Sequence, residues 1–294
     1  MSLNNPKFML RRDIALAITT MAIWGFNFVV IKIGLGSFPP LLFTALRFAL
    51  AAFPLVLFIG SPPVPWRYII GIGLALGVAK FGFLFISLSS HPVWGGMPAG
   101  LASLVLQTQA FFTIVYAALF LKERPRLMQL MGMAVAFTGI GLLAIKTGQS
   151  GPIRALGIVL VAAASWGVSN ILMKLANPPE VFRTIVWVSV VPPLPLLALS
   201  WVFEGPTRIF HALSHVSWVG ISALAYIAFV STLFGFAVWN ALLKRYQASL
   251  VAPFSLLVPV FGLISAALFL NEQLTFSQVV AVILVLCGLI LNSL

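Results

Sequence analysis

Two positively charged side chains lie inside long apolar stretches of the sequence. Arg47 stands in the stretch 38–59 and Lys80 in the stretch 67–89, while all five acidic residues fall at the ends of such stretches or between them. A charge in an apolar environment needs a partner, which here must be backbone carbonyl groups, aromatic rings, water or the carboxylate of a solute. We interpret Lys80 as a carboxylate-binding residue. The alternative is that Lys80 is uncharged because of its burial, or that it reaches the membrane interface.

Two tryptophans and two asparagines form a second group of candidates. Trp24 and Trp166 each precede a glycine and are followed by Asn27 and Asn170, respectively. Both tryptophans fall well inside apolar stretches, whereas tryptophans that anchor a protein at the membrane interface stand near the ends of spans. We expect all four side chains to line a cavity and bind substrate. The alternative is helix packing, since the glycines admit close neighbours.

Further polar or amphipathic candidates for substrate binding are Gln107, Gln109, Trp239 and Asn240. Each signal is weak, because a single amide in a spanning helix often serves as a contact between helices. Arg47 is included among the binding candidates, with bonding to the carbonyl groups of a broken helix as its alternative role.

Composition defines the elements that must position these residues. Hydrophobic residues make up 61% of the chain and charged residues only 7%, against about 25% charged residues in soluble domains. Such a surface suits hydrocarbon rather than water. The single cysteine excludes an internal disulfide and a cysteine-based metal cluster, and we expect no metal and no cofactor.

Ten apolar segments are each about as long as a helix needs to cross the hydrocarbon core. The N-terminal stretch from about Ile14 to Gly36 is longer than the apolar part of a signal peptide, so it is interpreted as the first span. We therefore expect an all-α integral membrane protein with ten transmembrane helices. The segments cover 13–35, 38–59, 67–89, 97–121, 127–146, 153–175, 181–203, 216–240, 247–270 and 275–294.

The distribution of basic residues predicts the orientation of these helices. Lysine and arginine favour cytoplasmic loops. With the N-terminus in the cytoplasm, eleven of the 17 Lys and Arg residues fall inside, four fall outside, and Arg47 and Lys80 remain within spans. The pattern predicts a multi-pass protein of the bacterial inner membrane with both termini in the cytoplasm. The net charge of +12 thus has a cause other than nucleic-acid binding, which we do not expect.

Matched landmarks in the same order in the two halves of the chain indicate that it contains an internal repeat. They predict one five-helix unit in 1–148 and a second in 149–294, inserted upside down because five is an odd number. Inverted repeats are typical of secondary transporters, whose substrate site lies near the bilayer midplane between the repeats. The matched landmarks are Trp24-Gly25 and Trp166-Gly167, Lys32 and Lys174, Ala99 and Ala248, Glu123 and Glu272, and Gly139 and Gly288.

Several strings of the sequence resemble the drug/metabolite transporter superfamily, EamA type, over nearly the whole chain. They are WGFNFVVIK at 24–32, PP at 39–40 with LRF at 46–48, GMPAGLASLVLQ at 96–107, RY at 245–246 and VAPFSLLVPV at 251–260. The strings are similar in particular to those of bacterial exporters of cysteine and O-acetylserine. The resemblance implies an efflux carrier with helices around a central cavity. The stretch 91–95 departs from the pattern and weakens the substrate assignment.

The sequence therefore predicts a secondary transporter that exports amino acids or related small metabolites by alternating access. Its expected partners are a small-molecule substrate and the lipid bilayer, and the expected oligomeric state is a monomer or a weak homodimer. The alternatives are a drug or nucleotide-sugar carrier on the same fold, an integral-membrane enzyme and a structural scaffold. An enzyme requires clustered acidic or histidine side chains, and only His211 and His215 come close to this pattern. We expect no enzymatic activity.

Overall fold

The computed structural model describes residues 9–53, 55–92, 94–150, 153–246 and 251–293, with the side chains of 146–150, 240, 244, 252–253 and 292–293 left out of the description. Within these ranges the chain is entirely helical apart from turns and short connections. Eight helical segments are long and apolar enough to cross a membrane, and two further apolar helices, Phe254–Leu270 and Phe276–Leu291, are shorter. The chain is thus a multi-pass membrane protein.

Four of the ten segments are uninterrupted helices: α1 (Arg11–Gly34), α8 (Leu127–Ser150), α9 (Ile153–Ala176) and α17 (Phe276–Ser293). The others are divided along their length. They comprise α2 (Pro40–Ala52) and α3 (Leu55–Phe58); α4 (Trp66–Ile72), η1 (Gly73–Phe81) and α5 (Gly82–Leu88); α6 (Ala99–Val105), η2 (Leu106–Thr108) and α7 (Gln109–Phe120); α10 (Val181–Val188) and α11 (Pro193–Phe203); α13 (Trp218–Ala225), η3 (Tyr226–Phe234) and α14 (Gly235–Arg245); and η4 (Ala252–Leu256) and α16 (Leu257–Leu270). The short helix α12 (Pro206–Ser214) connects α11 to α13.

Two of the divided segments contain a π-helix of nine residues, η1 and η3, at the same place in their chain order. A π-helix has a wider turn than an α-helix and is found mainly at functional sites. In η3 the hydroxyl of Thr232 donates to the carbonyl oxygen of Ile227, five residues earlier, at 2.8 Å. Both η1 and η3 lie in the middle of their segments, and η1 contains Lys80.

Pro192, Pro193 and Pro195 fall within the predicted span 181–203, where proline is expected to interrupt a helix, and the structure divides this segment into α10 and α11. The α10 helix ends at Val188 and α11 begins at Pro193, because proline lacks the amide hydrogen that would continue the helix. The break packs against two glycines of η1. A Cβ atom on Gly73 would lie 2.6 Å from Val191 Cβ, and one on Gly77 would lie 2.0 Å from Pro192 Cγ. The glycines therefore allow the broken helix to approach the π-helix.

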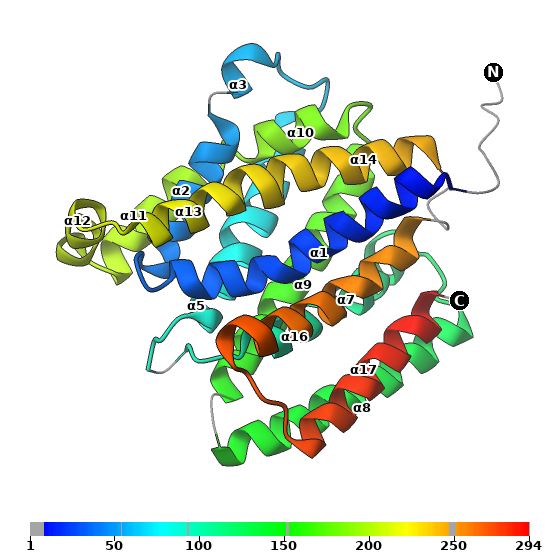
Figure 1. Cartoon of the computed structure of the whole chain (residues 1–294). Helices are drawn as coiled ribbons and strands as arrows, with labels where there is room; N and C mark the ends of the chain where they lie inside the picture. The colour runs from blue at the N-terminus through cyan, green and yellow to red at the C-terminus, as the bar shows by residue number, and fades with distance from the viewer. Residues whose placement is uncertain (1–8, 54, 93, 151–152, 247–250, 294) are drawn as a thin grey trace.

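The α8 and α17 helices run side by side along one edge of the molecule, where the backbones meet at Gly139 and Gly288 (Figure 1). A Cβ atom on Gly139 would lie 2.8 Å from the carbonyl oxygen of Ala281, and one on Gly288 would lie 2.5 Å from that of Gly132. The α1 helix packs instead against α16 and α14. Figure 1 also shows that α1 begins and α17 ends on the same side of the molecule, as expected for an even number of spans.

Ion pairs join the ends of helices that are far apart in the sequence. Lys32, near the end of α1, pairs with Glu272 after α16 at 2.9 Å, and Lys174, near the end of α9, pairs with Glu123 after α7 at 2.5 Å. Each glutamate follows a residue with positive φ, Lys122 or Asn271, which ends the preceding helix. With the N-terminus in the cytoplasm, the order of the predicted spans puts Lys32 and Glu272 outside and Lys174 and Glu123 inside, so each pair joins residues expected on the same side of the membrane.

Candidate functional site

Arg47 of α2 and Lys80 of η1 lie in the interior of the bundle, where 2% and 4% of their surfaces are exposed. The two cationic groups contact the same aromatic ring. Arg47 Cζ lies 3.8 Å from the centroid of the Phe81 ring, and Lys80 Nζ lies 3.2 Å from it. Lys80 Nζ also lies 4.3 Å from the ring of Trp166 in α9. The faces of aromatic rings attract cations, so these rings stabilise the two charges in part.

Neither cation has a carboxylate partner in the described structure, although all five acidic residues of the chain are described. Each acid interacts with other groups at the end of a helix. Asp13 pairs with Arg245 at 3.1 Å, Glu180 pairs with Arg183 at 3.2 Å, Glu123 and Glu272 pair with lysines, and Glu204 accepts hydrogen bonds from backbone amides of α2. The chain therefore supplies no internal anion for the two buried bases.

The guanidinium group of Arg47 is only partly satisfied. Its Nη2 atom donates to the hydroxyl of Thr232 in η3 at 3.0 Å, whereas Nε and Nη1 are buried without a hydrogen-bond partner. A buried donor without a partner costs about 1–3 kcal/mol, and more when it is charged. This arrangement differs from the alternative suggested by the sequence, in which Arg47 bonds the carbonyl groups of a broken helix.

Trp24 of α1 approaches the same π-helix. Its Nε1 atom donates to the carbonyl oxygen of Ser231 in η3 at 2.9 Å, one residue before the hydroxyl that binds Arg47. A Cβ atom on Gly235 would lie 2.5 Å from Trp24 Nε1, so the glycine leaves room for the indole. The ring of Trp239 lies 5.7 Å from that of Trp24. The η3 helix thus positions both Trp24 and Arg47.

Asn27 and Asn170 follow the two matched tryptophans by three and four residues, respectively, and differ in their bonding. Asn170 Nδ2 donates to Gln109 Oε1 at 2.7 Å and to the hydroxyl of Thr113 at 3.0 Å, so it connects α9 to α7. Asn27 is 6% exposed, and its Oδ1 atom is buried without a partner. Packing therefore accounts for Asn170 and Gln109, whereas it leaves Asn27 with an unused acceptor.

The structure thus brings together five of the predicted site residues around η1 and η3: Arg47, Lys80, Trp166, Trp24 and Trp239. Gln107 is buried in η2, and the side chain of Asn240 lies outside the described part of the structure. Sequence reasoning missed Phe81, which contacts both cations, and Thr232, which binds Arg47. Phe81 directly follows Lys80 in the chain, but one phenylalanine among 25 carries no signal of its own.

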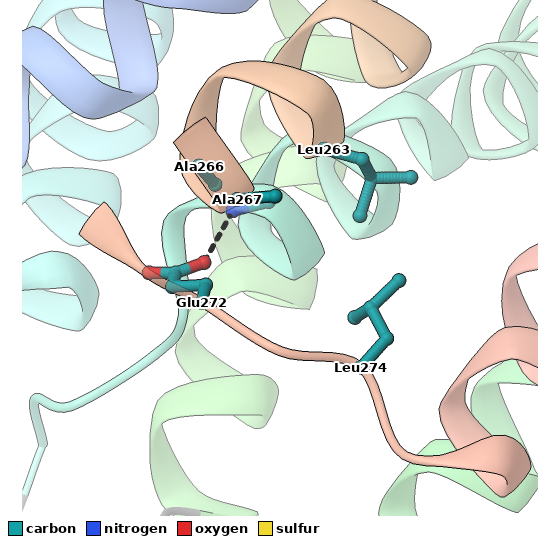
Figure 2. Close-up of a pocket in the computed structure, with 6 residues that line it drawn as sticks. Leu263, Ala266, Ala267, Glu272 and Leu274 are labelled. Carbon is teal, nitrogen blue, oxygen red and sulfur yellow. Dashed lines mark hydrogen bonds between the residues drawn. The ribbon is translucent and has the colours of Figure 1, made fainter. Parts of the chain in front are cut away.

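A pocket of about 240 Å³ lies at the end of α16, apart from the two cations. Its walls are formed by Gly100, Leu263, Ala266, Ala267, Glu272 and Leu274 (Figure 2). Both carboxylate oxygens of Glu272 already accept hydrogen bonds. Oε1 accepts from the amide of Ala99 at 2.8 Å and from Lys32, and Oε2 accepts from the amide of Gly100 at 3.0 Å. The bond to Gly100 is dashed in Figure 2. The pocket therefore has no free polar group to recognise a solute.

The histidines contribute no metal site within the described residues, where no group of three or more His, Cys, Asp or Glu side chains is placed to hold an ion. The ring of His211 in α12 stacks on that of His215, the residue that follows the helix, with the ring centroids 4.5 Å apart. In the stretch 91–95, the amide of Gly95 donates to the carbonyl oxygen of His91 at 2.9 Å, and Trp94 lies 5.9 Å from the guanidinium of Arg154.

Comparison with known proteins identifies the family to which this chain is similar. The model of the EamA-like transporter family matches residues 12–145 and again residues 153–294. A probable amino-acid metabolite efflux pump of Escherichia coli K12 is 42% identical over 290 residues, which cover 97% of this chain and 95% of the relative. The protein of the same description from Salmonella typhimurium LT2 is 43% identical over 290 residues, with the same coverage.

Two more distant similarities extend the comparison. A probable terminal-alkyne amino-acid exporter of Streptantibioticus cattleyicolor is 27% identical over 268 residues, which cover 87% of this chain and 84% of the relative. A crystal structure of another protein superposes with a TM-score of 0.63 at 17% identity and covers 95% of both chains. At that identity the structural likeness concerns the fold alone.

Proposed function

The chain belongs to the EamA-like transporter family, and we propose on that basis that it exports amino acids or related small metabolites across the bacterial inner membrane. Relatives that are 42% and 43% identical over nearly the full chain are described as probable amino-acid metabolite efflux pumps. In this proposal both termini lie in the cytoplasm, and the solute moves by alternating access between two halves of the bundle.

The pair of buried cations carries the proposal. Arg47 and Lys80 share the Phe81 ring, and neither has a carboxylate partner although all five acids of the chain are described. Every amino acid has a carboxylate, so a bound amino acid supplies the missing anion. Hydrogen bonds between ionised groups are shorter and stronger than neutral ones. The carboxylate of the solute accepts from Lys80 Nζ and from the unbonded nitrogens of Arg47.

The aromatic side chains form the walls around this anion site. Trp166 of α9 contacts Lys80. Trp24 donates to the carbonyl oxygen of Ser231 in η3, and the next residue, Thr232, binds Arg47. Their rings provide apolar surface for the remainder of the solute and exclude water, which strengthens each electrostatic interaction in the site. In the described conformation the two cations are shielded from solvent, which corresponds to an occluded state.

Two inverted five-helix halves, 1–148 and 149–294, form the scaffold of the proposed carrier. Corresponding features support this division. The segments with η1 and η3 correspond, and Gly25 packs against α16 as Gly167 packs against α7, with added Cβ atoms 2.6 Å from Phe261 Cβ and 3.0 Å from Phe112 Cβ. The family model also matches each half once.

The two lysine–glutamate pairs act as the gates of alternating access in this proposal. Lys32–Glu272 joins the halves on the outer side and Lys174–Glu123 joins them on the inner side. Glu272 also accepts from the first amides of α6, so opening the outer gate exposes the start of that helix. Opening of one gate while the other stays closed exposes the site to one side of the membrane at a time.

Purified protein in liposomes tests the proposal directly. Vesicles loaded with radiolabelled Cys, Thr, Met or Phe are expected to release at least one of the four faster than vesicles without protein. The Arg47→Met variant is expected to lose this release, whereas Arg183→Met, which removes an arginine that pairs with Glu180 at a helix end, is expected to retain it. Absence of transport of all four amino acids by the native protein would refute amino-acid export.

A further inference from the structure

We infer that Asn27 recognises the ammonium group of the solute, so that the carrier requires a free α-amino group in addition to a carboxylate. The inference rests on the proposed function and deepens it. Of the described side chains, the buried polar atoms without a hydrogen-bond partner are three: Arg47 Nε, Arg47 Nη1 and Asn27 Oδ1. The two nitrogens are hydrogen-bond donors that belong to a positively charged group, and the oxygen is a hydrogen-bond acceptor that belongs to a neutral amide.

Buried polar atoms without partners are rare in folded proteins, and each one calls for a missing partner. The three atoms here are complementary to an α-amino acid. Its carboxylate accepts from the guanidinium, and its ammonium donates to the amide oxygen. Because the five acids of the chain are engaged elsewhere, no carboxylate is available for the ammonium. An amide oxygen is then the acceptor that remains.

Asn27 and Arg47 stand on two helices that both pack against η3. Asn27 lies one turn after Trp24 on α1, so the two side chains share a face of the helix. Trp24 contacts η3 from this face, and Arg47 of α2 contacts η3 through Thr232. The two helices also touch at their connected ends, where a Cβ atom on Gly34 would overlap the ring of Phe43.

The π-helix η3 connects the same two helices. Trp24, one turn before Asn27 on α1, donates to the carbonyl oxygen of Ser231, and Arg47 donates to the hydroxyl of the next residue, Thr232. These bonds fix α1 and α2 relative to each other at the depth of the unpaired atoms. The site is thus held in shape before the solute enters, which favours discrimination between solutes.

Asn170 provides a control for this role. It follows Trp166 by four residues, whereas Asn27 follows Trp24 by three, and its amide nitrogen is bonded to Gln109 and Thr113. Replacement of Asn170 removes a packing contact and leaves the three unpaired atoms in place. Replacement of Asn27 removes one of the three and breaks no hydrogen bond of the described structure.

The test compares amino acids with their des-amino analogues in proteoliposomes. The probes are L-methionine with 4-(methylthio)butanoate, and L-phenylalanine with 3-phenylpropanoate. We expect the native protein to transport the amino acid roughly 10- to 150-fold faster than its analogue, the range given by one hydrogen bond to a charged group. Asn27→Leu should reduce transport of the amino acid to the rate of the analogue and leave the analogue unchanged. Asn27→Asp, which keeps an acceptor, should retain the preference.

The outcomes separate this inference from the proposed function. Transport of neither amino acid by the native protein would overturn amino-acid export and the role of Asn27 together. Transport of an amino acid with the native preference retained in folded Asn27→Leu would overturn the role of Asn27 alone. Asn170→Leu is expected to keep the native preference whatever its total rate. Loss of the preference in Asn170→Leu as well would also refute the assignment, because a general change in packing would then explain both.

Discussion

Replacement of Lys80 by methionine is expected to reduce transport strongly without destabilising the protein. Methionine has a similar length and no charge, so it fills the space next to Phe81 and Trp166. The change removes two contacts between the ammonium and aromatic rings, at 3.2 and 4.3 Å from the ring centroids. Each contact contributes about 0.5–2 kcal/mol. It also removes a buried charge without an acidic partner, whose desolvation costs several kcal/mol.

The two effects on folding have opposite signs and similar size, so the melting temperature of Lys80→Met should equal or exceed that of the native protein. The effect on transport has no such compensation. Loss of one hydrogen bond between the ammonium and a carboxylate weakens binding by about 1.5–3 kcal/mol, which is roughly a 10- to 150-fold reduction in transport at low solute concentration.

Differential scanning fluorimetry of tryptophan emission and release from proteoliposomes measure the two quantities on the same preparation. Arg183→Met is the control, because Arg183 is 33% exposed and pairs with Glu180 at a helix end, outside the site and the proposed gates. It should change the melting temperature little, since exposed ion pairs contribute at most about 1 kcal/mol. Native transport by a folded Lys80→Met protein would refute the role of Lys80 in binding. A large drop in its melting temperature would show instead that Lys80 stabilises the fold.

Two further predictions concern the scaffold. Gly77→Val should destabilise the protein by about 1–3 kcal/mol or more, because the added Cβ atom would overlap Pro192 Cγ. The control is Gly141→Val, which has no atom within 4 Å of its added Cβ and should melt like the native protein. Equal melting temperatures of the two variants would contradict the close packing at Gly77. Burial raises the pKa of Glu204 above its ordinary value of 4.5, against hydrogen bonds from Ser200 and the start of α2 that lower it. The unfolded carboxyl group therefore ionises first as the pH rises, and this group's contribution to the free energy of unfolding decreases from pH 4.5 upward through the folded-state pKa. Melting curves recorded across this range should show the decrease in the native protein and not in Glu204→Gln, and parallel pH profiles would refute the shift.

The helical segments were predictable because the solvent imposes strong constraints on the sequence. In hydrocarbon every backbone amide and carbonyl must be bonded within the segment, so a long apolar run leaves the helix as the available form. Lys80 and Arg47 could be identified for the same reason, since a charge stands out in an apolar run. The prolines at 192 and 193 likewise predicted the break between α10 and α11.

The π-helices η1 and η3 had no comparable signal. A π turn differs from an α turn in its hydrogen-bond register and not in the kind of residue it accepts, so composition does not reveal it. The same limit explains why Thr232 was missed, since a single threonine in a spanning helix usually bonds to its own backbone. Its position on η3 opposite Arg47 depends on how two distant segments pack.

The repeat in the sequence identified Lys32, Lys174, Glu123 and Glu272 as landmarks without indicating that they form pairs. Equal spacing within each half shows which residues correspond, but a contact between the halves depends on their relative orientation. The structure joins the lysine of each half to the glutamate of the other. Asn27 and Asn170 illustrate a further limit, because they follow their tryptophans by three and four residues, project from different sides of their helices and have different partners.

The wide turns of η1 have a consequence for reading insertions and deletions. A π turn contains about one residue more than an α turn, and each residue advances a helix by about 100°. Deletion of one residue between Gly73 and Phe81 would thus hardly alter the length or hydropathy of the span, yet it would rotate α4 relative to α5. Two chains with indistinguishable hydropathy profiles can therefore direct different side chains into the interior, and a one-residue gap in an alignment here marks a change of inner surface.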